Sequence, residues 1–97
     1  MLAYERENLR AALNARLKVV RRWIPQAIVA AQNAVTGGPV TLRDGYAGVR
    51  FVGKVLWNTD DLEHIRTVPE QNLYGLLIEG TIGAAQYRLE KLRKAHG

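Results

Sequence analysis

The clearest pattern in the sequence is a stripe of apolar residues in its first third. Apolar side chains recur there at steps of three or four, the spacing that places them on one face of a helix. The stripe comprises Leu9, Leu13, Leu17, Val20, Ile24, Ile28, Ala31 and Val35. Pro25 removes a backbone donor and clashes with the preceding turn, so the pattern predicts helices at 3–23 and 25–35 with a kink between them. Gly37 and Gly38 then end the second helix.

The pattern changes to a period of two over residues 39–57, where apolar and polar residues alternate. Asp44-Gly45 favours a type I′ turn, because such a turn needs positive φ at both central positions. Pairing Arg43 with Tyr46 across this turn places apolar residues opposite one another, so the turn and the alternation agree on one register. The sequence therefore predicts a β-hairpin at 39–57, whose second strand has an edge without a partner.

Two further helices are expected after the hairpin. A pair of aspartates suits the first turn of a short helix at 60–66, where acidic groups oppose the helix dipole. A capping box with proline in the first turn then predicts a long C-terminal helix at 68–95. Glu79-Gly80 allows the alternative that this helix ends there and that Thr81 caps another. The expected fold is mostly α with one β-hairpin, an α+β class, in a single domain over residues 1–97.

Length and composition limit the classes of function. The chain has 97 residues, a formal net charge of +5, and no cysteine, and it also lacks serine, the common hydroxyl nucleophile. A chain of this length buries a modest core, so association with other copies would help to stabilise it. We expect no enzymatic activity, no cofactor, no small-molecule substrate and no membrane span, because no suitable cluster or apolar stretch is present.

Two segments resemble a nucleotide site and a metal site, but each lacks residues that such a site needs. Gly48–Lys54 matches the glycine and lysine spacing of a phosphate-binding P-loop, but the next residue, Val55, has no hydroxyl for Mg²⁺ and the segment alternates like a strand. His64 lies beside acidic residues that are better explained as helix caps, and a zinc site needs three or four converging ligands. We therefore expect neither a nucleotide site nor a metal site.

The charge is concentrated at the two ends of the sequence. Residues 1–22 carry six basic and two acidic residues, and residues 88–97 carry four and one. Basic helical faces suit contact with backbone phosphates without sequence specificity, although many such faces are only solvated. The expected nucleic-acid-binding residues are Arg10, Lys18, Arg21, Arg22, Arg88, Lys91, Arg93 and Lys94.

The C-terminal helix is expected to provide contacts between copies. It is apolar on two sides, and its small residues would permit close approach of another helix. The expected interface residues are Tyr46, Gly80, Gly83, Ala84 and Tyr87. The predicted partners are therefore further copies of the chain, in a homo-oligomer, and DNA bound through its phosphates.

The order of elements over residues 26–66 resembles a known architecture. A helix at Ala27–Val35, the segment VTLRDGYAGVRFVGKVLW and the segment DDLEHI resemble the small head-to-tail joining protein of lambda-type phages. Long helices joined by a hairpin are also similar to coat proteins of rod-shaped archaeal viruses. Both resemblances imply a structural part of a particle, in the virion or the host cytoplasm.

The expected function is thus a non-enzymatic, self-assembling structural protein of a virus or phage particle. Its basic helical faces would lie toward packaged DNA. The alternative is a small soluble regulator or inhibitor that docks on one protein partner.

Overall fold

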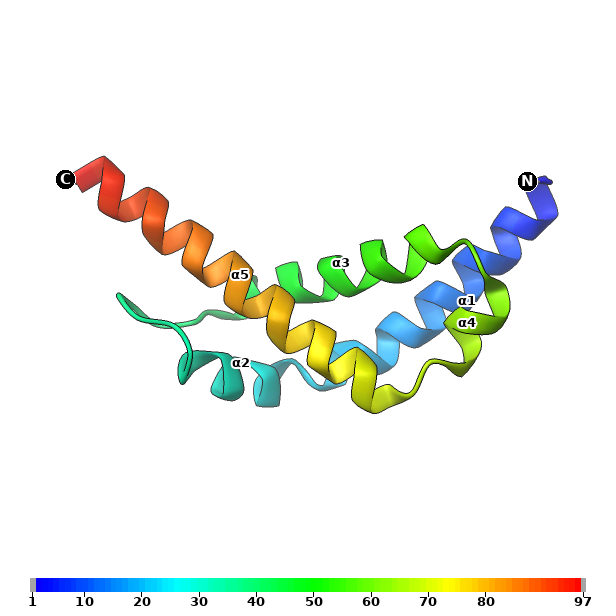
Figure 1. The fold of residues 1–97 in the computed structure, drawn as a ribbon, viewed down its shortest axis with the longest axis horizontal. Coiled ribbons are helices and arrows are strands. Elements are labelled where there is room, and N and C mark those ends of the chain that lie inside the picture. The colour runs from blue at the N-terminus through cyan, green and yellow to red at the C-terminus, as the bar shows by residue number, and fades with distance from the viewer. Residues whose placement is uncertain (1, 97) are drawn as a thin grey trace.

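The computed structural model describes residues 2–96, and within this range the chain forms helices joined by turns and irregular loops, with no strand. The helices are α1 (Ala3–Arg22), α2 (Ile24–Gln32), α3 (Leu42–Thr59), α4 (Leu62–Thr67) and α5 (Glu70–His96). They form an elongated crescent of 50 × 25 × 16 Å, with the two termini at its opposite tips (Figure 1). The fold is therefore all-α over the described residues.

The β-hairpin predicted over residues 39–57 is wrong, because α3 occupies most of this segment. The Thr41 hydroxyl accepts a hydrogen bond from the Asp44 backbone N–H (3.3 Å), and the Asp44 carboxylate accepts one from the Thr41 N–H (2.9 Å). This capping box starts a helix at the residues that had suggested a turn. Beyond it, buried residues recur at helical steps. They are Gly45, Gly48, Val49, Val52, Gly53 and Leu56.

The correction has two further consequences. The unpaired strand edge is absent from residues 2–96, so it supplies no contact between copies. The helix-hairpin-helix order over residues 26–66, which carried the resemblance to viral proteins, is absent as well. The remaining predicted helices are present, with bounds that differ by up to three residues. α5 runs without interruption through Gly80, so the alternative of a break there is also wrong.

The apolar stripe of α1 and α2 forms one wall of the core. Leu9, Val20 and Ile24 are buried against residues of α3, α4 and α5. The two helices are separated at Trp23, and Pro25 lies in the first turn of α2, where its missing N–H removes no helical bond. Trp23 closes this corner: its indole N–H donates to Glu70 Oε1 (2.6 Å), and its ring packs at a tilt on Tyr74.

The centre of the fold is the close approach of α3 to α5. A Cβ atom placed on Gly48 would meet Thr81 Oγ1 and would lie 2.9 Å from the Leu77 carbonyl oxygen. A Cβ on Gly80 would lie 2.7 Å from the Phe51 Cβ and 3.0 Å from the Gly48 Cα. The two backbones are thus in near contact, and each glycine is there because a side chain does not fit. Buried Thr81 satisfies its hydroxyl by donating to the Leu77 carbonyl (2.7 Å).

A substitution at Gly48 tests this contact. We expect Gly48→Ala to lower the free energy of unfolding by about 1 to 3 kcal/mol, because the added methyl group overpacks backbone that cannot move aside. The measurement is urea denaturation followed by circular dichroism.

The matched control is Gly75→Ala in the exposed first part of α5, where nothing lies within 4 Å of the new Cβ. This change should raise stability by about 0.5 to 1 kcal/mol, because alanine favours the helix over glycine. Equal effects of the two substitutions would contradict the close approach of α3 and α5.

Candidate nucleic-acid interface

Helices α1 and α3 lie side by side and run in opposite directions (Figure 1). Leu17 of α1 packs on Gly53, where a Cβ would be 3.2 Å from its side chain. Ile24, just beyond α1, packs on Gly45 in the same way at 2.7 Å. The second half of α1 therefore lies along α3, and the outer sides of both helices make a shared surface.

This surface carries basic residues and no exposed carboxylate. Residues 8–22 contain no acidic residue, and the one acidic residue of α3, Asp44, is buried with 3% of its surface exposed. All seven cations at this surface have exposed side chains. They are Arg10, Lys18, Arg21, Arg22, Arg43, Arg50 and Lys54, and we refer to them as the α1–α3 basic face.

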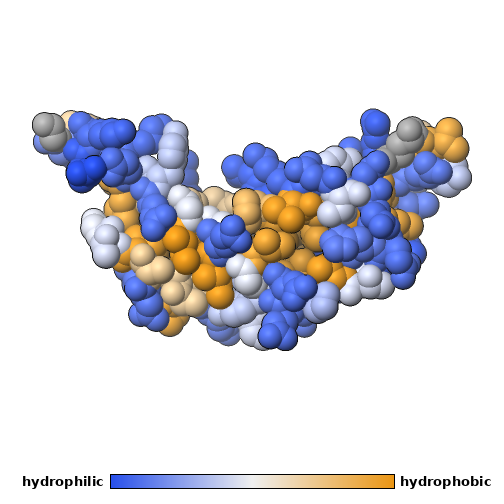
Figure 2. All heavy atoms as spheres, in the orientation of Figure 1, coloured by the Kyte–Doolittle hydropathy of each residue, from blue (hydrophilic) through white to orange (hydrophobic). Residues whose placement is uncertain are grey.

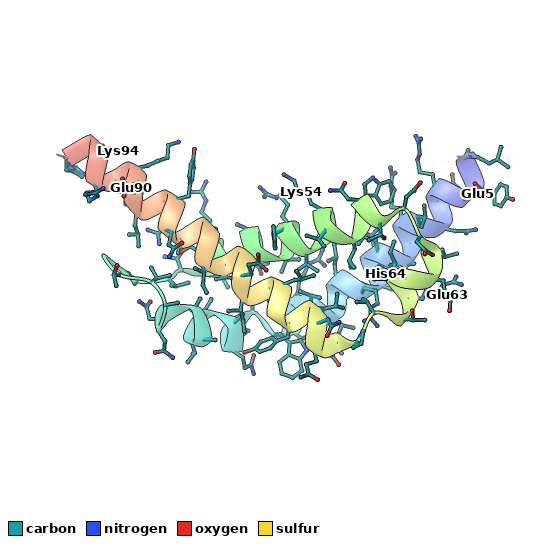
Figure 3. The ribbon with its side chains drawn as sticks, viewed as in Figure 1. Glu5, Lys54, Glu63, His64, Glu90 and Lys94 are labelled. Carbon is teal, nitrogen blue, oxygen red and sulfur yellow. The ribbon has the colours of Figure 1, made fainter. Side chains whose placement is uncertain are left out.

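The α3 members of the face form a straight row. At 100° per residue Arg43, Arg50 and Lys54 fall within an arc of about 40°, on the side opposite the buried residues of this helix. The row is about 16 Å long at a rise of 1.5 Å per residue. Hydrophilic residues line the edge of the molecule along α3 (Figure 2), and Lys54 points outward from this edge (Figure 3).

The α1 members flank this row. Arg10 and Arg21 fall within about 40° of Leu17 around α1, so they lie at the rim that adjoins α3. Tyr46 and Trp57 occupy the facing rim of α3, and Tyr46 is 51% exposed. Aromatic and basic side chains therefore share this surface.

Arg88, predicted to bind phosphate, is instead part of the fold. Its Nε and Nη2 atoms donate to the two carboxylate oxygens of Asp44 at 3.1 and 2.8 Å, and Nη2 also donates to the Pro39 carbonyl at 2.8 Å. These bonds hold the pKa of the Asp44 carboxyl below its ordinary value, although burial opposes them. Arg88 thus ties α5 to the start of α3, and its charge is already balanced.

The other predicted cations of α5 are on its last two turns, and Figure 3 shows Lys94 at one tip of the crescent, away from Lys54 of the α1–α3 basic face. Arg93 is paired with Glu90, with 2.6 Å between Nη2 and Oε1. The Lys91 ammonium lies 5.0 Å from the centre of the Tyr87 ring. Lys94 is exposed. Arg88 is bonded within the fold, whereas Lys91 and Lys94 on the following turns of the same helix are exposed.

The residues predicted to join copies are in different settings. Gly80 is covered by Phe51 of α3 in the same chain, so the helix that approaches it is internal. Gly83 and Ala84 border a shallow open hollow beside Phe51 and Ile82. Tyr46 and Tyr87 are exposed. Gly80 thus permits the close contact between α5 and α3. A Cβ atom on Gly83 would have no neighbour within 4 Å.

The structure provides little basis for other chemistry. Gly48–Lys54 lies inside α3, so its backbone N–H groups are engaged in the helix and do not form a phosphate-binding loop. Among residues 2–96 no three His, Asp or Glu side chains gather as metal ligands would. Within the same range no helix combines the length and the apolar character needed to cross a membrane.

No protein-family model, curated protein or solved structure matches this chain. The role of the α1–α3 basic face is therefore inferred from its charge and geometry alone.

Three residues of the face, Arg43, Arg50 and Lys54, were missed by the sequence analysis because they had been assigned to strands. Their spacing of seven and then four residues is the signal that identifies them, since it repeats on one helical face. Buried Val49, Val52 and Leu56 are spaced by three and then four residues, which also indicates a helix.

The Asp44 and Arg88 pair gives a prediction for stability and its pH dependence. Asp44→Asn should lower the free energy of unfolding at pH 7 by about 2 kcal/mol, because hydrogen bonds to a buried charge are lost. The folded pKa of Asp44 lies below its ordinary value of 3.8. Its ionised form therefore stabilises the fold above pH 3.8, and this contribution is lost as the pH falls through the folded value.

The measurement is urea denaturation of both proteins at a series of pH values below pH 7, and the difference in stability should shrink as the pH falls below 3.8 toward the folded pKa of Asp44. Glu90→Gln is the control, because it removes a surface ion pair of small effect. A constant difference between Asp44→Asn and the unchanged protein at every pH would contradict the role given to this carboxylate.

Proposed function

We propose that this chain is a non-enzymatic nucleic-acid-binding protein that uses the α1–α3 basic face to contact backbone phosphates. The single observation that carries the proposal is the gathering of seven exposed cations on two adjacent helices. Neither residues 8–22 of the first helix nor residues 42–59 of the second contain an exposed carboxylate. Neutralisation of phosphates by such residues releases counterions and drives binding that is independent of sequence.

The residue types of the face favour a role in phosphate binding over that of a surface in contact with solvent only. Five of its seven cations are arginines, and the planar guanidinium can donate two hydrogen bonds to one phosphate. Within residues 2–96 none of the cations in the α3 row forms an ion pair, and Asp44 is paired with Arg88. Tyr46 adds an exposed aromatic surface next to the row, which suits contact with a sugar or an unstacked base.

The geometry favours a structural role for this binding. The face is spread along two helix surfaces and ends in no enclosed pocket, so it suits covering a length of nucleic acid better than reading bases. Assembly of copies around packaged DNA, as in a coat protein of a virus or phage particle, is the setting we propose. This setting rests on the basic face and on apolar residues exposed near the two ends of the chain, Leu2, Tyr4 and Leu92. It does not depend on a hairpin.

Neutralising the α3 row tests the proposal. Arg50→Gln combined with Lys54→Gln should weaken binding to a DNA duplex about 10-fold or more at 0.1 M salt. The slope of log K against log salt should become shallower by about two, because two phosphate contacts are removed. Fluorescence anisotropy with two unrelated duplex sequences measures both quantities, and the loss should be equal for both.

The matched control is Lys91→Gln combined with Lys94→Gln, which removes the same charge from the tip of α5. This control should keep most of the affinity of a single copy for a short duplex. Equal losses in both variants would indicate an effect of net charge and would remove the α1–α3 basic face as the site. Binding of an acidic protein with no affinity for DNA would favour the regulator alternative.

A further inference from the structure

One tip of the crescent is acidic, which the sequence alone does not reveal. The first turns of α1 and the segment from the α3–α4 turn through α4 meet there, at a hollow lined by Glu5, Asn8, Leu9, Asp60 and Leu62. Residues 2–9 and 60–67 carry five carboxylates against two arginines, a formal balance of −3. Glu5 and Glu63 both lie at this end in Figure 3.

The same tip exposes apolar side chains. Leu2 is 60% exposed and Tyr4 is 61% exposed, although both adjoin the first turn of a helix. Large apolar residues that project next to a charged rim are typical of a surface that another molecule covers.

The opposite tip has the complementary properties. The last turns of α5 extend beyond the body of the molecule, as Figure 1 shows. Between them and the loop at Thr36 and Gly37 is an open hollow of about 790 Å³, whose apolar lining comes from Leu89 and Leu92. Lys91 and Lys94 are exposed on the same turns. Arg88 and Arg93 are already paired with carboxylates, so these two lysines dominate the field of this tip.

We infer that copies of this chain associate head to tail, with the acidic tip of one copy docked on the basic tip of the next. Leu2 and Tyr4 would enter the hollow beside Leu92, while Lys91 and Lys94 would face the carboxylates of the acidic tip. The occupant is a second copy because one molecule carries both halves of the match, at opposite ends of its 50 Å axis. Opposite charge at the two surfaces steers and orients such an encounter.

This mode of association differs from a two-fold dimer. The two docking surfaces are different patches, so each copy keeps one free tip after pairing. Further copies can therefore add until the assembly closes as a ring or extends as a filament. The inference goes beyond nucleic-acid binding, and its test contains no nucleic acid. A failure of one proposal is therefore distinguishable from a failure of the other.

The experiment is a charge exchange between the tips. One variant carries Lys91→Glu and Lys94→Glu, and the second carries Glu7→Lys and Glu63→Lys. The four residues are exposed, and none of them caps a helix. Sedimentation velocity at low salt should show concentration-dependent oligomers for the unchanged protein and about 10-fold weaker association for each variant alone. An equimolar mixture of the two variants should recover association, because each altered tip then meets a tip of opposite charge.

The control is Arg50→Glu combined with Lys54→Glu, which changes the net charge by the same amount as the first variant. It should keep full self-association and lose DNA binding. Circular dichroism confirms that all variants are folded. A monomeric unchanged protein at millimolar concentration, variants that associate normally, or a mixture that stays dissociated would each overturn the inference.

Discussion

The near contact of the α3 and α5 backbones is the constraint on which the rest of the structure depends. Gly48 and Gly80 leave no room for a side chain between the two helices, so their positions are fixed relative to each other within a small tolerance. Gly48 is about 140° around α3 from the centre of the row Arg43, Arg50 and Lys54, so this contact turns the row away from α5. The bond between Arg88 and Asp44 then fastens the start of α3 to the same helix. The direction of the basic row is thus set by packing on its opposite side.

The helices outside α3 were predictable because one periodic or capping signal dominates in each of them. The stripe from Leu9 to Val35 has one period, and Pro25 marks its interruption in both the sequence and the structure. Residues 39–57 carry two signals at once, because Asp44-Gly45 suits a tight turn and Thr41 with Asp44 also suits a capping box. Local chemistry does not decide between them. The decision comes from α1 and α5, which bury the three-and-four pattern ending at Leu56 and thereby supply the energy that favours the helix.

The candidate site shows the same dependence on three-dimensional context. The sequence correctly marks Arg10, Lys18, Arg21 and Arg22 as exposed basic positions. It groups Arg88 with them, because its partner Asp44 lies 44 positions away in the chain. Counting charge along the chain also makes the whole of residues 1–22 look basic. In the fold, the first turns of α1 join the acidic α3–α4 turn, and the basic half of α1 joins α3.

This separation of surfaces allows the two proposed activities to reinforce each other. A single α1–α3 basic face offers only seven cations, and its attraction to phosphate is screened by salt. When copies associate through their tips, the faces stay uncovered and become linked at intervals set by the 50 Å length of the crescent. Binding of one face then raises the local concentration of the next, so the affinity of the assembly exceeds that of one copy without any new contact. In the proposed array, a face that binds weakly and without sequence specificity is therefore sufficient.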